Sequence, residues 1–133
     1  TPVASGRRTM LNRRSTMNDQ QSTVADLRKL VDAFVAERQW HQFHTPKNLS
    51  MALSIEAAEL MEHFQWLTIE ESQAVAKQPV ELAAVAEELA DVVAYACALA
   101  NALGIDIAAA LDDKMVKNAA KYPAEASRGK YKL

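Results

Sequence analysis

Cysteine, glycine and aromatic residues are all scarce in this 133-residue chain. Its one cysteine, Cys97, sits in an apolar run, and a single thiol excludes an internal disulfide. Only three glycines are present, and no alternating run of β-branched residues marks a strand, whereas alanine, leucine, glutamate and lysine abound. We therefore predict an all-α domain in a reduced, cytoplasmic protein, with Cys97 as a buried structural thiol.

Long apolar stretches and excess positive charge are also missing. No apolar segment reaches the roughly 18 residues of a membrane span, and the N-terminus lacks the apolar core of a secretory signal. The net charge of −2 argues against a protein that binds nucleic acid through phosphate contacts. We expect neither a membrane nor a nucleic acid among the partners.

The length allows one domain with a core of its own. Residues 1–21 are polar and basic without periodicity, and we predict a disordered extension there, either an upstream segment or a functional basic arm. Residues 22–123 carry the helical pattern and form the predicted domain. Residues 124–133 are predicted to be a basic C-terminal tail.

Apolar spacing and capping residues predict the helices of this domain. Thr23 and Asp26 form a capping box at the start of the first helix, Gly104 suits a helix C-terminus, and Asp106 caps the last helix. One short helix is expected in the connection 68–79. The longer predicted helices cover about 23–39, 46–67, 80–103 and 107–121.

Two pairs of carboxylates border the apolar stripes of the second and fourth of these helices. Glu56 and Glu59 lie three residues apart, and Glu88 and Asp91 repeat that spacing, so each pair shares one face of its helix. Either pair alone is a weak signal, but two helices packed together would aim four carboxylates at one spot. A hard divalent cation with oxygen ligands, Mg²⁺ or Mn²⁺, is the natural counter-charge.

The last helix presents a face of cationic and polar side chains. Lys114, Asn118, Lys121 and Tyr122 fall at i, i+4, i+7 and i+8. A metal site with such a face suits a polyphosphate substrate, because the metal bridges phosphate oxygens, the lysines neutralise charge and a bound water attacks phosphorus.

Other kinds of site fit the residues less well. Di-iron bundles use Glu-x-x-His, whereas the histidine here, His63, follows Glu59 by four residues. No glycine-rich phosphate loop, nucleophile elbow or zinc-ligand spacing is present. The segment with Trp40, Phe43 and His44 is either a packed corner or the lining of a pocket.

Three segments closely resemble the MazG-like nucleoside triphosphate pyrophosphohydrolases, and in particular their dCTP pyrophosphatase branch. They are FHTPKNLSMALSIEAAELMEHFQWL, EELADVVAYACALA and KMVKNAAKYP, and the likeness covers about residues 24–132. The resemblance implies a four-helix-bundle-like fold that assembles as a homodimer or homotetramer. It also implies Mg²⁺-dependent cleavage of a dNTP, dCTP or a modified pyrimidine nucleotide, to dNMP and pyrophosphate in nucleotide-pool cleaning, with Mn²⁺ as a substitute.

The resemblance also implies roles for individual residues. Glu56, Glu59, Glu88 and Asp91 would be the metal ligands, with Glu56 or Glu59, or a water held by a glutamate, supplying the catalytic base. The implied substrate-binding residues fall into three groups: Trp40, His44 and Trp66 at the base; Lys47, Asn48 and Tyr95 near the sugar and phosphates; and Lys114, Asn118, Lys121 and Tyr122, from the same or a neighbouring subunit, at the phosphates.

Two alternatives within or near this reading stay open. The chain could be a phosphoribosyl-ATP or dUTP pyrophosphatase of the same superfamily, which a substrate panel would separate. It could also be a non-catalytic helical bundle that binds a nucleotide or a partner protein, in which case Glu56→Gln would barely matter. A di-metal storage or redox bundle is a weaker alternative that iron analysis would expose.

Overall fold

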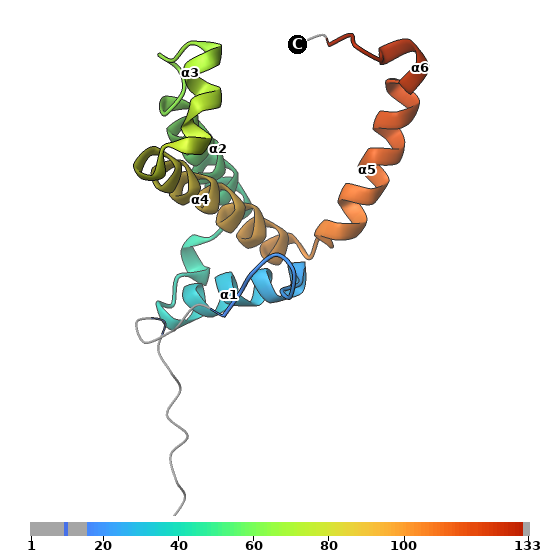
Figure 1. Cartoon of the computed structure of the whole chain (residues 1–133). Coiled ribbons are helices and arrows are strands. Elements are labelled where there is room, and N and C mark those ends of the chain that lie inside the picture. The colour runs from blue at the N-terminus through green and yellow to red at the C-terminus, as the bar shows by residue number, and fades with distance from the viewer. Residues whose placement is uncertain (1–9, 11–15, 132–133) are drawn as a thin grey trace, which may run out of the picture.

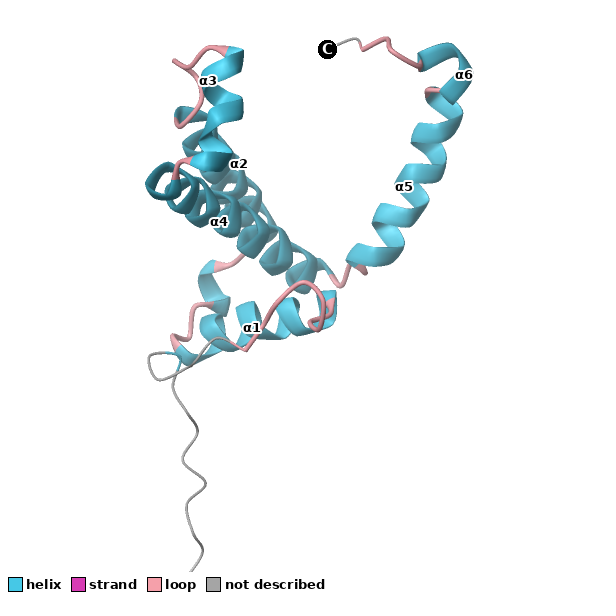
Figure 2. Ribbon diagram, in the orientation of Figure 1, coloured by secondary structure: helices cyan, strands magenta, loops and turns pink. Residues whose placement is uncertain are grey.

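A computed structural model of the chain describes Met10 and residues 16–131. No strand occurs in this described part, which confirms the all-α prediction (Figure 2). Two short 3-10 turns, His41–Phe43 and Val75–Lys77, join the helices. In chain order the α-helices are α1 (Val24–Glu37), α2 (Pro46–Glu62), α3 (Ile69–Ala74), α4 (Pro79–Leu103), α5 (Ile107–Lys121) and α6 (Ala124–Ser127), as Figure 1 shows.

Side-chain caps fix where several of these helices begin. The predicted capping box of α1 is present: Asp26 N–H donates to Thr23 Oγ1 at 3.1 Å, and Thr23 N–H donates to the Asp26 carboxylate at 2.9 Å. Thr45 caps α2, where Pro46 opens the first turn. Asp106 caps α5 through a 2.8 Å bond from the Ala109 N–H. Local chemistry therefore places these boundaries as expected.

The prediction for the end of α2 was wrong. The apolar periodicity continues to Leu67, but the helix stops at Glu62 and residues 63–66 form turns. The His63 and Phe64 N–H groups donate to the carbonyls three residues back, of Leu60 and Met61, which tightens the chain out of the α-helical path. The apolar pattern could not reveal this, because turns of that kind preserve the same approximate spacing.

The packed part of the molecule is built around α4. The contact between α2 and α4 is the most extensive, and α1 packs against α4 as well (Figure 1). Cys97 is buried here, as predicted, and its burial raises the pKa of the thiol. The buried apolar residues of the described chain are Val35, Leu49, Val75, Cys97, Ala98 and Ala100.

Helix α5 stands apart from this packed group. Gly104 ends α4 with a left-handed φ of 66°, and α5 leaves at a bend of 102° from α4. Among the described residues, α5 makes no packing contact comparable to those of α1 or α2 with α4. Its apolar side chains Leu111 and Met115 are therefore 57% and 49% exposed.

The regions at the two ends of the chain extend beyond the described residues. Of the predicted disordered extension 1–21, residues 1–9 and 11–15 lie outside them, while Asn18 starts a turn in which its carbonyl accepts from the Ser22 N–H at 2.9 Å. Within the predicted tail 124–133, residues Ala124–Ser127 form the four-residue helix α6. Residues 132–133 are not among the residues that the structure describes.

Across the described helices, none taken singly combines the length and the apolar composition of a membrane span. Only α4 and α5 counted together, across their bend, meet those criteria.

Candidate functional site

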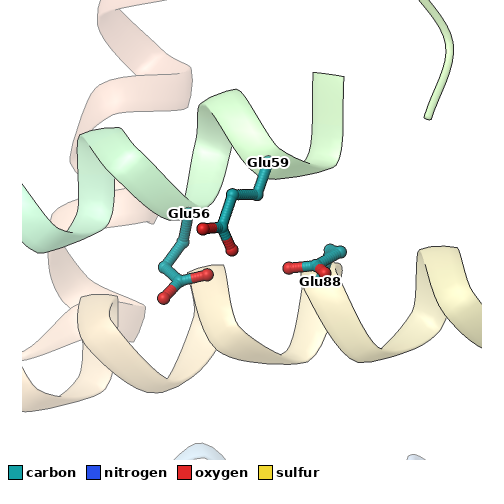
Figure 3. Close-up of side chains that lie close together, drawn as sticks. All are labelled: Glu56, Glu59 and Glu88. Atoms are coloured by element: carbon teal, nitrogen blue, oxygen red, sulfur yellow. The ribbon is translucent and has the colours of Figure 1, made fainter. Parts of the chain in front are cut away.

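Three carboxylates meet between α2 and α4. Glu56 and Glu59 on α2 point toward Glu88 on α4 (Figure 3). One oxygen from each of the three lies within 4.8 Å of the others. The three-residue spacing on α2 and the close packing of the two helices therefore produce the convergence that the sequence predicted.

The cluster is electrostatically unfavourable as it stands. Burial raises the pKa of Glu56, and the closeness of the Glu59 carboxylate and the charges of Glu59, Asp91 and Glu88 raise it further. Burial and the charges of Glu59 and Asp91 also raise the pKa of Glu88, against a smaller opposing effect of His63. Within the described chain, Glu56 Oε2 and Glu88 Oε2 are buried without a hydrogen-bond donor.

A divalent cation fits this donor set. Oxygen ligands from several carboxylates are what hard cations such as Mg²⁺ prefer. A cation there would supply a partner to the two buried oxygens and remove the like-charge repulsion. The cluster can therefore hold a metal ion, and the most direct ligands are Glu56, Glu59 and Glu88.

Asp91 and His63 stand at the margin of the cluster. Asp91 is exposed and does not belong to the trio with oxygens within 4.8 Å, although its charge acts on both Glu56 and Glu88. His63, the C-cap residue of α2, places Nε2 3.9 Å from Glu88 Oε1. The structure thus brings three of the four predicted ligands together and adds a histidine beside them.

Aromatic rings line up from the end of α1 to the middle of α4. The ring centroids of Trp40 and His44 are 6.5 Å apart, and those of His44 and Tyr95 are also 6.5 Å apart. Phe34 meets Trp40 edge to face at 5.9 Å. A hollow of about 170 Å³ borders His44. Three of the predicted substrate residues therefore lie in one row, in which neighbouring ring planes are tilted by 38° and 39°.

The other predicted base and sugar residues lie outside this row. Trp66 follows the end of α2 and is 87% exposed. Lys47 and Asn48 lie in the first turn of α2, where Asn48 Nδ2 donates to the Phe43 carbonyl at 3.1 Å. Asn48 thereby ties the start of α2 to the aromatic segment, while Trp66 has no place in the ring row of this single chain.

The predicted phosphate-binding residues sit on α5 and at its end. Lys114, Asn118 and Lys121 belong to the helix, and Tyr122 is its C-cap residue. Lys121 Nζ lies 5.3 Å from the centre of the Tyr122 ring. Because α5 diverges from α2 and α4 in Figure 1, this face is not packed against the carboxylate cluster of the same chain.

Some residues around the site had no predicted role in it. His63 shares the stripe of Glu56 and Glu59, four residues after Glu59, and that spacing was the available signal. Phe34 had no predicted role, although it supports the Trp40 ring. No sequence signal pointed to the contact of Arg28 with Asn101, residues 73 positions apart.

Comparisons with known proteins agree with this geometry. The model of the MazG-like family matches residues 51–132, which include all four predicted metal ligands. Among solved structures, the crystal structure of a pyrophosphatase from Archaeoglobus fulgidus superposes with a TM-score of 0.68 at 37% identity. The match covers 80% of this chain and 98% of that one.

Curated relatives point the same way. The chain is 46% identical over 109 residues to dCTP pyrophosphatase 1 of Rattus norvegicus and 44% identical over 108 residues to dCTP pyrophosphatase 1 of Homo sapiens. These matches cover 82% and 81% of this chain, but the chain spans only 64% of the length of either relative. With the matching family model, the shared fold and the carboxylate cluster, the chain belongs to the MazG-like family.

Proposed function

We propose that the chain is a Mg²⁺-dependent nucleoside triphosphate pyrophosphohydrolase that converts dCTP or a modified pyrimidine dNTP to dNMP and pyrophosphate. The single observation that carries this proposal is the convergence of Glu56, Glu59 and Glu88 with two buried oxygens that lack donors. The pyrophosphatase names of its relatives support the reaction class, and dCTP pyrophosphatase 1 supports the pyrimidine.

Different residues of the chain would have different roles in the reaction. Glu56, Glu59 and Glu88 would hold the cation, with Asp91 completing the set from the exposed side. When bound, the cation neutralises charge on the phosphate oxygens and on the carboxylates. Glu56 or Glu59 orients a water and accepts its proton as the water attacks phosphorus.

The aromatic row would bind the base. A base stacked on tryptophan gains roughly 1–3 kcal/mol with little preference among bases. Trp40 and His44 are the members of this row placed at the base, while Tyr95, with Lys47 and Asn48, would lie near the sugar and phosphates. Discrimination among bases then rests on hydrogen bonds to the base edge, for which the His44 ring offers a donor or acceptor.

A second copy of the chain would complete the site. The phosphate-binding face of α5 (Lys114, Asn118, Lys121 and Tyr122) extends away from its own carboxylate cluster, and apolar side chains on α5 remain exposed. We propose a homodimer or homotetramer in which α5 and the exposed Trp66 serve a neighbouring subunit's site. A reduced, cytoplasmic setting fits the buried thiol of Cys97.

Pyrophosphate release from a panel of dNTPs and NTPs, with Mg²⁺ and with EDTA, tests the activity. Glu56→Gln removes one carboxylate charge at nearly constant shape and should abolish release. Glu62→Gln is the matched control, because Glu62 is exposed on the same helix outside the cluster. The ranking of nucleotides by rate of pyrophosphate release separates a dCTP enzyme from a dUTP or phosphoribosyl-ATP enzyme. If no nucleotide releases pyrophosphate, the chain is a binding protein and not this enzyme.

Mixed oligomers test the shared site. Glu56→Gln removes a proposed metal ligand from a site, whereas Lys121→Met removes a proposed phosphate-binding cation. If one site draws on two subunits, random mixing of the two variants restores about a quarter of the sites to full composition. If each site lies within one chain, mixing restores nothing.

A further inference from the structure

Arg28 on α1 holds the junction between α4 and α5. Its Nε donates to Asn101 Oδ1 at 3.0 Å, and one of its terminal nitrogens donates to the Ile105 carbonyl at 2.6 Å. In return, Asn101 Nδ2 donates to the Arg28 carbonyl at 3.2 Å. Both ends of the Asn101 amide are thus used, and we call these three bonds the Arg28 clamp.

The Arg28 clamp joins the last turn of α4 to the residue that leads into α5. Asn101 is in the last turn of α4, and Ile105 is one residue before the Asp106 cap of α5. Between them Gly104 takes a φ of 66°, and no atom lies within 4 Å of the place where a side chain would start. A glycine takes this left-handed conformation at little cost, and the Gly104 and Ile105 N–H groups, which both donate to the Ala100 carbonyl, close the turn within the backbone.

The direction of α5 therefore depends on few contacts. Packing does not fix it, because α5 has no extensive contact with the other described helices. The Asp106 cap sets where α5 begins but not where it points. The two bonds that Arg28 donates span the bend itself, and a planar guanidinium holds two acceptors in a fixed relative orientation, which a single ammonium cannot do.

We propose that Arg28, through Asn101 and the Ile105 carbonyl, is a positioning residue that sets the direction of α5. The direction itself follows from the clamp geometry alone. Its consequence for nucleotide binding rests on the proposed function, because it takes the α5 face with Lys114, Asn118, Lys121 and Tyr122 as the phosphate-binding face.

A distance measurement tests the direction without any activity. Spin labels at Ser54→Cys on α2 and Ala120→Cys near the end of α5, in a Cys97→Ala background, report the distance between the helices by pulsed electron–electron double resonance. Labelled subunits are diluted into unlabelled protein so that only distances within one chain are read. Arg28→Met should broaden the distance distribution at least about twofold, while Lys29→Met, on the next and exposed residue, should leave it unchanged.

Kinetics test the consequence. If the competent direction of α5 falls to about a tenth of its population, KM for the nucleotide rises about tenfold while kcat at saturation stays the same. Mn²⁺ affinity, measured with the metal alone, should not change, because the carboxylate cluster lies on α2 and α4. Asn101→Ala should match Arg28→Met, the double variant should be no worse than either, and Arg28→Lys should rescue only in part.

The outcomes separate the two proposals. An unchanged distance distribution in Arg28→Met overturns the positioning role, whatever the activity. A broadened distribution with KM unchanged overturns its link to the nucleotide. If the wild-type protein releases no pyrophosphate, the proposed function fails, and the spin-label distances still decide whether the clamp directs α5.

Discussion

The pair formed by α2 and α4 differs from α5 in how its functional side chains are held. Glu56, Glu59 and Glu88 converge because two long helices pack closely within one chain. The polar side chains of α5 share a face as well, but that face is not packed against α2 or α4 of the described chain. One chain thus brings the three carboxylates together by itself, whereas the contacts of the α5 face depend on the direction in which α5 points.

The largest expected effect is a loss of subunit assembly and of activity without a loss of metal binding. Ile107, Leu111 and Met115 form an apolar stripe on α5, and Leu111 is 57% exposed. Leu111→Glu would place a charge in that stripe, and we expect dissociation to monomers with at least about a hundredfold loss of pyrophosphate release. Sedimentation at micromolar concentration and the release assay measure the two effects.

Val116→Glu is the matched control for that experiment. Val116 is 68% exposed on α5 but lies about 140° around the helix from Leu111. It should keep both assembly and activity, and both variants should bind Mn²⁺ as the wild type does. A wild-type protein that already sediments as a monomer would contradict the shared site.

The second effect concerns the charge on α5. Lys121→Met removes one cation from the proposed phosphate-binding face, and a lost hydrogen bond to a charged group raises KM about tenfold or more. Metal affinity should stay unchanged because Lys121 is not part of the cluster. Lys77→Met, at an exposed position after α3, is the control. Equal KM values in both variants would remove α5 from substrate binding.

A third change acts on the α2–α4 side. Glu88→Ala removes one of three repelling carboxylates, so the metal-free protein should melt about 3 °C higher than the wild type. The same change should abolish stabilisation by Mg²⁺, which depends on binding to the folded state. Thermal unfolding in EDTA and in Mg²⁺ measures both. Full Mg²⁺ stabilisation in the variant would place the metal elsewhere.

The smallest effect is a dependence of stability on pH. The pKa values of Glu56 and Glu88 are raised in the folded protein, so between the ordinary glutamate value and the raised values the folded state binds more protons than the unfolded state. Stability of the metal-free protein should therefore fall as pH rises through that window. Tm in EDTA, from about pH 4.5 to about pH 8, should decline less in a Glu56→Gln/Glu88→Gln variant.

Local chemistry explains which parts of the fold the sequence revealed. The Thr23 capping box, the Asp106 cap and Gly104 each act within a few residues, and the helix boundaries they predict are confirmed. The end of α2 at Glu62 was missed because the turns after it keep an apolar spacing similar to that of a helix.

The sequence could predict less of the site, because the positions of its residues depend on packing between distant segments. Equal spacing in two helices predicted the convergence of the carboxylates, but the exposed position of Asp91 depends on how α2 and α4 rotate against each other. Likewise, the distance of Trp66 from the aromatic row follows from where α2 ends. The Arg28 clamp joins residues 73 and 77 positions apart, and no pattern along the chain encodes such a pair.

The side-chain caps at α1, α2, α3 and α5 have a consequence for how the protein folds. Each supplies a start signal that needs no distant residue, so helical structure can form early and quickly while the chain is still open. In α5 the cap is retained although its apolar side chains stay exposed. Far-UV circular dichroism would therefore report a helical chain both before and after subunits associate. A variant that no longer assembles would still give a native-like spectrum.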